Sequence, residues 1–294
     1  MVDLIHCPVC KEQYFSKYLD CKDHFLTKED FTIVECDNCH LLFTNPRPTE
    51  IDQPSYYKSE EYISRSNVKG GLVNSIYHKV RNHTIKKKYS IVNRNSQGNN
   101  ILDIGCGTGE LLNYFKLKGW NTRGVEPDPD ARKLAIDNYQ LNISDLDSLL
   151  DKADIRFDII TMWHVLEHVW DLHSYLDGIK NLLNDNGTFI VAVPNRNSWD
   201  AKHYKSMWAA YDVPRHLYHF SQKSMNELME SANFKLHKIV PMKFDSYYIS
   251  LLSEKYKTGK QNMLKGFLNG LYSNFYARLN QNNFSSLIFI YKIG

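Results

Sequence analysis

The strongest chemical signal in this sequence is an acid ahead of a glycine turn, in the run ILDIGCGTGELL at residues 101–112. The apolar start of this run is typical of a buried strand, and the apolar spacing after the turn is typical of a helix. Glycines permit positive φ and let a ligand approach the backbone closely. Asp103 stands just before the turn. Glu126 ends the next apolar run, where an acid can accept both ribose hydroxyls of an adenosine. Together these residues predict the nucleotide-binding corner of an α/β sheet.

The spacing of the glycines narrows the ligand. It is G-x-G-x-G here, whereas a dinucleotide site has G-x-G-x-x-G. A carboxylate at Asp103 would also repel a pyrophosphate, but it would attract a ligand that carries an ammonium and a sulfonium. The run resembles the cofactor site of the class I S-adenosylmethionine (SAM) methyltransferases. That resemblance implies SAM as the cofactor, with Asp145 against the adenine amino group. The implied cofactor contacts are Asp103, Gly105, Cys106, Gly107, Gly109, Glu126, Asp145 and Trp163.

The glycine turn has one alternative interpretation and contains one cysteine. A glycine turn in an α/β protein can also hold another ligand. Cys106 lies within the turn, and we expect it to be a small packing residue rather than a nucleophile.

Histidines in two segments are candidates for acid–base chemistry, because methyl transfer to a hydroxyl is helped by a base near neutrality. His164 and His168 follow the predicted fourth strand in WHVLEHV, and His216 and His219 lie in VPRHLYHF. We expect His216 to act as the base and Arg215 to orient an anionic or polar acceptor, with His164 in reserve. The alternative for His216 is a packed, hydrogen-bonded histidine.

The spacing of His164, Glu167 and His168 raises the question of a second metal. In some relatives of the resembling family a Glu-x-x-Glu-His run holds a divalent metal that activates the acceptor hydroxyl. Here the first position is histidine, which disfavours magnesium because magnesium prefers oxygen ligands. The alternative is that Glu167 and His168 cap the following segment, and the sequence leaves this open.

Cysteines are concentrated at the N-terminus, where five of the six lie in the first 39 residues. Two C-x2-C knuckles, CPVC and CDNC, predict one tetrahedral structural zinc in a ribbon. The predicted ligands are Cys7, Cys10, Cys36 and Cys39. This N-terminal segment is too polar to bury a core of its own. We therefore expect the metal to hold it folded. Redox pairing, or a ligand set that uses Cys21 and His24, are the alternatives.

The elements that position these residues alternate between strand and helix from about residue 98, which predicts a doubly wound, Rossmann-like seven-stranded α/β sheet. The predicted strands lie near 101–105, 121–126, 141–143, 157–163, 187–193, 234–241 and 285–293. The predicted domains are a zinc ribbon at 1–45, a linker and helical lead-in at 46–97, and a methyltransferase domain at 98–294 with substrate-side insertions at 196–220 and 242–284.

Two further stretches each have two interpretations. The aromatic residues Trp199, Tyr204, Trp208 and Tyr211 either pack as a second small core or line the acceptor pocket. The basic residues Lys79, Arg81, Lys86, Lys87 and Lys88 form either a solvated helix face or a phosphate-contacting surface.

Composition and resemblance set the expected function. The net charge is only +3, which argues against a general polyanion binder. No leader and no apolar run of membrane-spanning length is evident, so we expect a cytoplasmic protein. The segment 157–172 is similar to the ubiquinone-biosynthesis O-methyltransferases, and a ribbon followed by CHLLFTNPRP resembles a generic bacterial subgroup.

We therefore expect SAM-dependent methylation of a small-molecule, lipid-like or saccharide acceptor. Methylation of the exocyclic amino groups of nucleic-acid bases is disfavoured, because WHVLEH stands where that reaction typically has a (D/N/S)-P-P-(Y/F) loop. An RNA methyltransferase that holds RNA with the ribbon and the basic residues is the alternative, and a SAM-binding module without catalysis is a third class. We expect the methylated atom to be a hydroxyl oxygen. The sequence alone does not identify that atom, the acceptor or the oligomeric state.

Overall fold

The computed structural model describes residues 1–57, 72–145 and 155–294. In the helix that begins at residue 72, the side chains are described from residue 80 onward. The chain forms two compact units. Unit 1 comprises Met1–Lys58, His164–His173 and Ala192–Phe289, and unit 2 comprises Ser59–Trp163, Ser174–Val191 and Ile290–Gly294. Each unit is therefore assembled from segments that are distant in the sequence.

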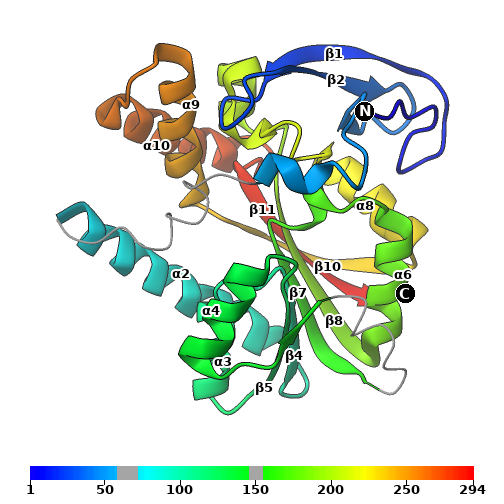
Figure 1. Cartoon of the computed structure of the whole chain (residues 1–294), viewed down its shortest axis with the longest axis vertical. Coiled ribbons are helices and arrows are strands. Elements are labelled where there is room, and N and C mark those ends of the chain that lie inside the picture. The colour runs from blue at the N-terminus through cyan, green and yellow to red at the C-terminus, as the bar shows by residue number, and fades with distance from the viewer. Residues whose placement is uncertain (58–71, 146–154) are drawn as a thin grey trace. The chain divides into compact units, whose positions relative to one another are not determined.

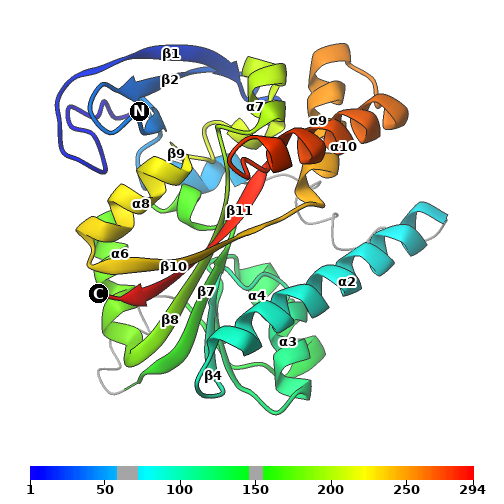
Figure 2. The same ribbon diagram turned by 180° about the vertical axis from the view of Figure 1, so that it is seen from behind.

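A seven-stranded sheet runs in the order β10-β11-β8-β7-β4-β5-β6 (Figures 1 and 2). Its strands are β4 (Asn100–Ile104), β5 (Asn121–Val125), β6 (Ile143–Ser144), β7 (Phe157–Trp163), β8 (Leu183–Pro194), β10 (Phe234–Pro241) and β11 (Ser286–Ile293). The predicted seven-stranded α/β sheet is confirmed, including the closing strand near the C-terminus.

Strands β4 and β7 form the part of this sheet that matters most for function. β4 pairs in parallel with β5 on one side and with β7 on the other. The strand order therefore reverses between β4 and β7, and ligands of such sheets bind outside the carboxyl ends of the strands at that point. Both strands are nearly continuous apolar runs that are buried, as expected of strands covered on both faces.

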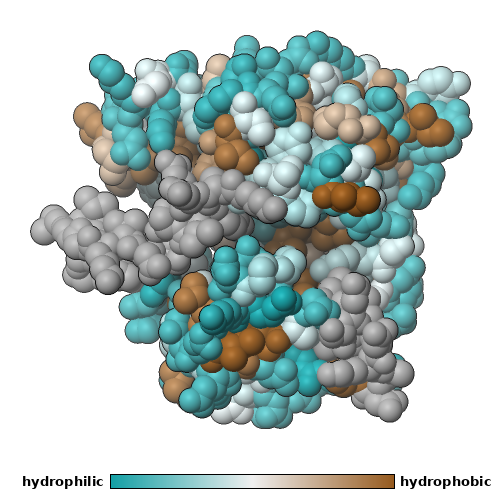
Figure 3. Space-filling model, viewed as in Figure 1, coloured by the Kyte–Doolittle hydropathy of each residue, from teal (hydrophilic) through white to brown (hydrophobic). Residues whose placement is uncertain are grey.

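The helices of unit 2 begin and end on local signals. They are α2 (Leu72–Asn95), α3 (Glu110–Leu117) and α4 (Pro129–Tyr139), and most of α6 (Leu172–Leu182) also belongs to this unit. Asp128 caps α4 by accepting a hydrogen bond from Ala131 N, with Pro129 at the first helical position. In Figure 3 the surface over α3 and α4 is mostly hydrophilic with an apolar patch.

The helical lead-in predicted over residues 56–95 is described only in part. The 3₁₀ helix η1 (Gln53–Tyr57) covers its start and α2 covers its end. Residues 58–71, including Tyr62 of that prediction, lie outside the described part of the chain.

Unit 1 contains a second, four-stranded sheet in the order β1-β2-β3-β9. Its strands are β1 (Phe15–Lys22), β2 (Asp30–Cys36), β3 (Leu42–Thr44) and β9 (Tyr218–His219). The unit also holds α7 (Trp199–Tyr204), α8 (Gln222–Ser231), α9 (Asp245–Thr258) and α10 (Met263–Leu279), with short 3₁₀ helices η2 (Leu166–His168), η3 (Lys205–Met207) and η4 (Ala209–Tyr211).

The ribbon sheet shares its core with a segment from much later in the chain. Phe31, Ile33 and Leu42 of the ribbon pack in one buried cluster with Trp208 and Tyr211. The strand β9, which pairs with β3, joins the same two regions. The domain boundaries proposed from the sequence remain a prediction, but the core of the ribbon extends beyond residue 45.

Within the described ranges, no helix is both long enough and apolar enough to cross a membrane.

Candidate active site and metal centre

The glycine turn after β4 has the backbone geometry that a close ligand needs. Gly105, Gly107 and Gly109 have φ of 73°, 54° and 84°, values that favour glycine. A Cβ at Gly109 would come within 2.6 Å of Leu141 Cδ1, so this glycine lets α3 pack closely. A Cβ at Gly107 would meet no atom within 4 Å. Gly107 is therefore the position at which a ligand can approach the backbone.

Asp103 is a buried carboxylate near the carboxyl end of β4, where the strand order reverses between β4 and β7. Its register partner on β7 is Thr161, whose hydroxyl donates to Oδ1 at 2.5 Å. Burial raises the pKa of Asp103 to about 6, against the lowering effects of the Thr161 hydrogen bond and the Lys88 charge. A bound cation would offset the cost of ionising this group.

Glu126, at the end of β5, holds the glycine turn in place. Its Oε2 accepts the Gly107 N–H at 2.7 Å, and its Oε1 accepts the Asp128 N–H at 3.0 Å. Burial raises the pKa of Glu126, although these two backbone hydrogen bonds oppose the shift. Each oxygen of a carboxylate has two acceptor positions, so both retain one for a ribose hydroxyl.

The other predicted cofactor contacts also lie in unit 2. The carboxylate of Asp145 is exposed and lies 3.9 Å from Arg132 Nη1. Lys88 Nζ lies 4.3 Å from the centre of the Trp163 ring, and the buried indole N–H of Trp163 has no hydrogen-bond partner among the described residues. Cys106 is buried with its thiol pKa raised by burial, which fits packing rather than nucleophilic attack.

A cluster of three histidines surrounds Glu167 in unit 1. Glu167 is fully buried, and neither of its carboxylate oxygens has a hydrogen-bond partner in the described chain. His164 Nδ1 lies 3.4 Å from Glu167 Oε1, and His164 Nε2 lies 3.0 Å from Asp245 Oδ2. Burial lowers the pKa of His164, but the hydrogen bond with Asp245 and the ion pair with Glu167 outweigh it and raise that pKa to about 9. His164 is therefore a cation near neutrality.

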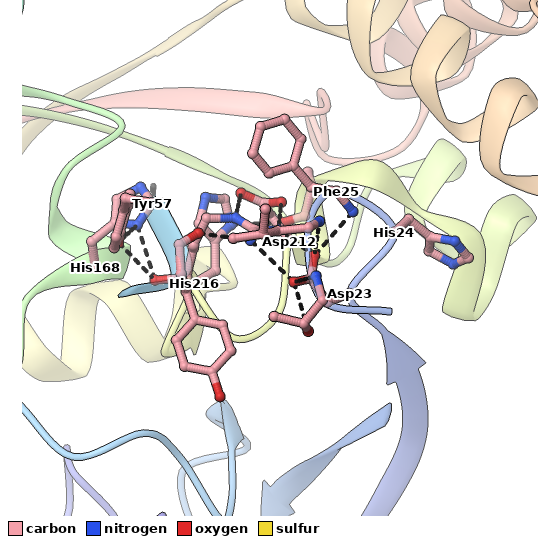
Figure 4. A network of polar contacts seen from close by, with 12 residues as sticks. Asp23, His24, Phe25, Tyr57, His168, Asp212 and His216 are labelled. Atoms are coloured by element: carbon pink, nitrogen blue, oxygen red, sulfur yellow. Dashed lines mark hydrogen bonds and ion pairs between the residues drawn. The ribbon is translucent and has the colours of Figure 1, made fainter. Parts of the chain in front are cut away.

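His216 and His168 lie on the other side of this carboxylate. His216 donates from Nδ1 to the Ala210 carbonyl at 2.8 Å, and its Nε2 lies 4.0 Å from Glu167 Oε1. The rings of His216 and His168 meet edge to face, with centroids 4.6 Å apart. Figure 4 shows both rings beside Tyr57, whose hydroxyl oxygen lies 2.9 Å from His168 Nδ1.

The protonation states follow from this packing. Burial lowers the pKa of His168 to about 4, so His168 is neutral. Burial raises the pKa of Glu167, but the contact with the His164 cation outweighs it and lowers that pKa. The cluster thus holds an ionised carboxylate between a cationic and a neutral imidazole.

Donor atoms of Glu167, His168 and His216 all lie within 4.8 Å of one another. Two imidazoles and one carboxylate are a ligand set that holds zinc or iron. The sequence prediction grouped His164, rather than His216, with Glu167 and His168. In the structure His164 contacts both Glu167 and Asp245, but it is not part of the converging set. Nothing in the local sequence of His216 indicated this proximity, because residues 167 and 216 are brought together only by packing.

Arg215 lies at the centre of a buried ion-pair network. Its Nη2 donates to Asp23 Oδ1 at 2.8 Å and to Asp212 Oδ1 at 2.7 Å, and its Nη1 donates to the Tyr56 carbonyl at 3.2 Å. Figure 4 shows Asp23 and Asp212 converging on this network. Because the guanidinium is engaged with these groups, the geometry favours a structural role over the predicted orientation of an acceptor.

Asp23 and Asp245 are the partners that sequence reasoning missed. Asp23 accepts backbone hydrogen bonds from Phe25, Leu26 and Thr27 in addition to the Arg215 pair. Its partner is 192 residues away, so no local signal could have identified the pair.

His219 is placed as a structural residue. Its Nε2 lies 3.3 Å from Thr44 Oγ1, and its ring meets Tyr211 edge to face. Burial lowers its pKa well below the ordinary value.

The four knuckle cysteines converge, with all sulfurs within 4.8 Å of one another. The Sγ atoms of Cys7 and Cys39, and those of Cys10 and Cys36, are 3.5 Å apart, close to the roughly 3.8 Å separation implied by zinc–sulfur bonds of about 2.3 Å in a tetrahedron. We propose zinc here, as the donor chemistry fits it.

The two knuckles also share one backbone pattern. Lys11 N donates to Cys7 O and His40 N donates to Cys36 O, each at 3.0 Å. Lys11 and His40 both have positive φ, at 64° and 57°. The repetition of this turn aims both pairs of thiols at one point.

The alternative zinc ligands have other partners. Cys21 donates from its thiol to the Ser206 carbonyl at 3.5 Å, and His24 stacks on Tyr256 with ring centroids 4.6 Å apart. The structure therefore favours the four-cysteine set.

The aromatic segment supports the second-core interpretation for three of its four rings. Tyr204, Trp208 and Tyr211 are buried in the cluster shared with the ribbon. Trp208 Nε1 donates to Asp200 Oδ2 at 2.8 Å. Trp199 instead stacks on His203.

Comparisons with known proteins agree with this architecture. The family described as "Methyltransferase domain" matches residues 77–239. A ubiquinone biosynthesis O-methyltransferase from Rhodopseudomonas palustris (strain TIE-1) is 35% identical over 106 residues, which is 34% of this chain and 42% of the relative. The same-named protein of Bradyrhizobium diazoefficiens is 35% identical over 105 residues, with the same coverage. The chain thus spans about two fifths of the length of these curated relatives.

A solved structure shows the same fold. The magnesium protoporphyrin IX methyltransferase of Synechocystis PCC 6803 with bound SAM aligns with a TM-score of 0.50 at 12% identity, covering 85% of this chain and 100% of that chain. The family match extends over more than half of the chain and includes the glycine turn, Asp103 and Glu126. The chain belongs to the class I SAM-dependent methyltransferases.

Proposed function

We propose that the protein transfers the methyl group of SAM to a hydroxyl oxygen of a small-molecule, lipid-like or saccharide acceptor. Family membership supports SAM as the methyl donor. The names of the relatives support oxygen as the acceptor atom. The observation that carries the proposal is the environment of His216, whose Nδ1 is bonded to Ala210 while its Nε2 lies beside the buried Glu167 carboxylate.

The cofactor site fits SAM through three groups. Gly107 leaves space for close approach of a ligand. Glu126 can present carboxylate oxygens to a ribose, and the buried carboxylate of Asp103 would interact favourably with a cation. When bound, SAM supplies an electrophilic methyl on a sulfonium and leaves as a neutral thioether. The protein's main tasks are therefore to orient the acceptor and to remove its proton.

His216 is arranged to take that proton. The hydrogen bond from Nδ1 to Ala210 fixes the tautomer, so Nε2 carries the lone pair in the neutral ring. Once Nε2 is protonated, Glu167 at 4.0 Å stabilises the imidazolium. His164 is already cationic near neutrality and is a poor base, so we assign it to holding Glu167 ionised.

The test measures transfer of labelled methyl from SAM to hydroxylated phenols, lipids and saccharides. His216→Ala should lower turnover by roughly 10²–10⁴-fold, while the affinity for SAM measured by calorimetry stays unchanged. His203→Ala is the matched control, because His203 is an exposed histidine in the same unit. Full activity in His216→Ala would reject the assignment of the base.

A metal at Glu167, His168 and His216 is the competing reading of the same cluster, favoured by the convergence of their donor atoms. Chelation distinguishes the two. A general base works without added metal, whereas a metal centre loses activity on chelation and regains it with a divalent cation. In that case Glu167→Gln should also lower the metal content of the purified protein.

The RNA alternative gains no support from the described basic residues. Arg81 pairs with Glu110 at 3.1 Å, and Lys88 lies over the Trp163 ring. Methyl label recovered in RNA, with binding that weakens steeply with salt, would restore that alternative.

A further inference from the structure

Helix α10 buries its small and polar residues and exposes its large apolar ones. Most surface helices bury their large apolar residues and expose polar ones. The inward face of α10 instead carries small and polar residues, namely Gly266, Gly270, Ser273, Asn274 and Ala277. The large apolar residues on the other side are exposed by 48–70%, namely Met263, Leu264, Phe267, Leu268, Leu271, Tyr272, Phe275 and Leu279. We call this set the α10 apolar face.

The inward face explains how the helix is held without burying large side chains. A Cβ at Gly270 would come within 2.7 Å of Tyr247 Cα, and one at Gly266 within 2.8 Å of Leu251 Cα. These glycines therefore let α10 lie directly against the backbone of α9, and Figure 2 shows the two helices side by side. Asn274 Nδ2 also donates to the Lys243 carbonyl and to Ser246 Oγ, each at 2.8 Å. The apolar face is thus presented on a firmly held helix.

The exposed charged residues that follow Glu254 all have one sign. Glu254 is the last acidic residue of the sequence, and six basic residues follow it. Five of these flank or belong to the α9–α10 pair and are exposed, namely Lys255, Lys257, Lys260, Lys265 and Arg278. Glu254 itself is buried and lies 3.3 Å from Lys265 Nζ, so it offers no exposed negative charge.

We propose that the α10 apolar face docks on the surface of an anionic phospholipid membrane. A helix with exposed Leu and Phe and a rim of lysine and arginine is the form that lies in the headgroup region of a bilayer. The same charge argues against self-association through this face, because two copies would bring rims of like charge together. This inference is independent of the proposed acceptor and of the base.

The test is co-sedimentation of the full-length protein with vesicles of phosphatidylcholine, alone or mixed equally with phosphatidylglycerol. The protein should bind the mixed vesicles and bind the neutral ones weakly. Leu268→Gln with Leu271→Gln should weaken binding at least about tenfold, because each leucine loses favourable transfer into the apolar layer. The matched control is Leu117→Gln with Leu236→Gln, which removes two leucines exposed elsewhere and should bind like the original protein.

A charge variant provides an independent arm if the leucine variant does not fold. Lys257→Gln with Lys260→Gln should weaken binding to the mixed vesicles by about fivefold per lysine and leave binding to neutral vesicles unchanged. Absence of binding to the mixed vesicles, or equal binding by both leucine variants, would overturn the proposal. So would a dimer in light scattering that Leu268→Gln with Leu271→Gln converts to monomers, since the face would then be a subunit interface.

Discussion

At the scale of single residues, the most informative group is Asp103, a carboxylate that is almost fully buried. Burial favours its neutral form and raises its pKa to about 6, although Thr161 donates a hydrogen bond to it. Such a group is costly to ionise, and a bound cation lowers that cost. The site therefore favours a positively charged ligand.

This pKa leads to a pH-dependent affinity for SAM. Below pH 6 Asp103 is protonated and offers no charge to a cationic ligand, so SAM affinity should rise as pH increases through about 6. The gain should be about tenfold, as expected for one charge-assisted interaction. Calorimetry across this range measures it. Asp103→Asn should bind at the low-pH level throughout, and a flat profile in the original protein would contradict the prediction.

The stability of the ligand-free protein should respond with the opposite sign. The folded-state pKa of Asp103 lies above the ordinary value of 3.8. Its contribution to the free energy of unfolding is therefore fully present below pH 3.8 and is lost as pH rises through about 6.

At the scale of elements, the two cysteine knuckles bring four thiols to one point from turns 26–32 residues apart. Burial raises the pKa of Cys10, but hydrogen bonds from the Glu12 backbone and neighbouring thiols outweigh it and lower that pKa to about 7. The Cys10 thiol can therefore lose its proton readily to a metal. Burial raises the pKa of Cys36, and the hydrogen bond with Cys7 raises that of Cys39, so these two thiols need the metal itself to displace their protons.

Removal of the metal should destabilise the ribbon and the core that it shares with the aromatic segment. We expect one zinc per chain by metal analysis, and a melting temperature lower by about 5–10 °C in Cys36→Ser with Cys39→Ser, because several kcal/mol are lost. Cys21→Ala is the control and should keep its zinc, since Cys21 contacts the Ser206 carbonyl instead. Zinc retained by the double variant, or lost from Cys21→Ala, would refute the four-cysteine site.

At the scale of the whole molecule, Arg215 joins segments that are almost 200 residues apart. It pairs with Asp23 of the N-terminal region and with Asp212 of its own loop, and it is 2% exposed. A buried ion pair of this kind is costly to break from one side, because the remaining charge stays buried.

Arg215→Met should therefore lower the free energy of unfolding by about 3–5 kcal/mol, measured by urea denaturation. Lys223→Met is the control. It breaks the exposed Lys223–Glu227 pair within α8 and should cost less than about 0.5 kcal/mol. An Arg215→Met variant that keeps its stability but loses methyl transfer would instead support the predicted role of Arg215 in orienting the acceptor.

The features that could be predicted from the sequence are those that depend on residues close together in the chain. The glycine turn after β4, the buried runs of β4 and β7, and the C-x2-C knuckles are all set by residues within one or two turns of chain. Hydrophobic periodicity and glycine conformation act over that range, so the seven-stranded sheet and the class of cofactor could be predicted.

Contacts between groups that are distant in the chain could not be predicted, because they are set by packing. His164 and Asp245 are 81 residues apart, and Arg215 and Asp23 are 192 apart, so their pairing results from packing that no local spacing specifies. The orientation of α10 is decided in the same way. Its sequence has an apolar and a small-residue face, but the close contact of Gly266 and Gly270 with α9 turns the small residues inward. The apolar face is left outside because steric fit to the α9 backbone, rather than hydrophobicity, determines which side of this helix is buried.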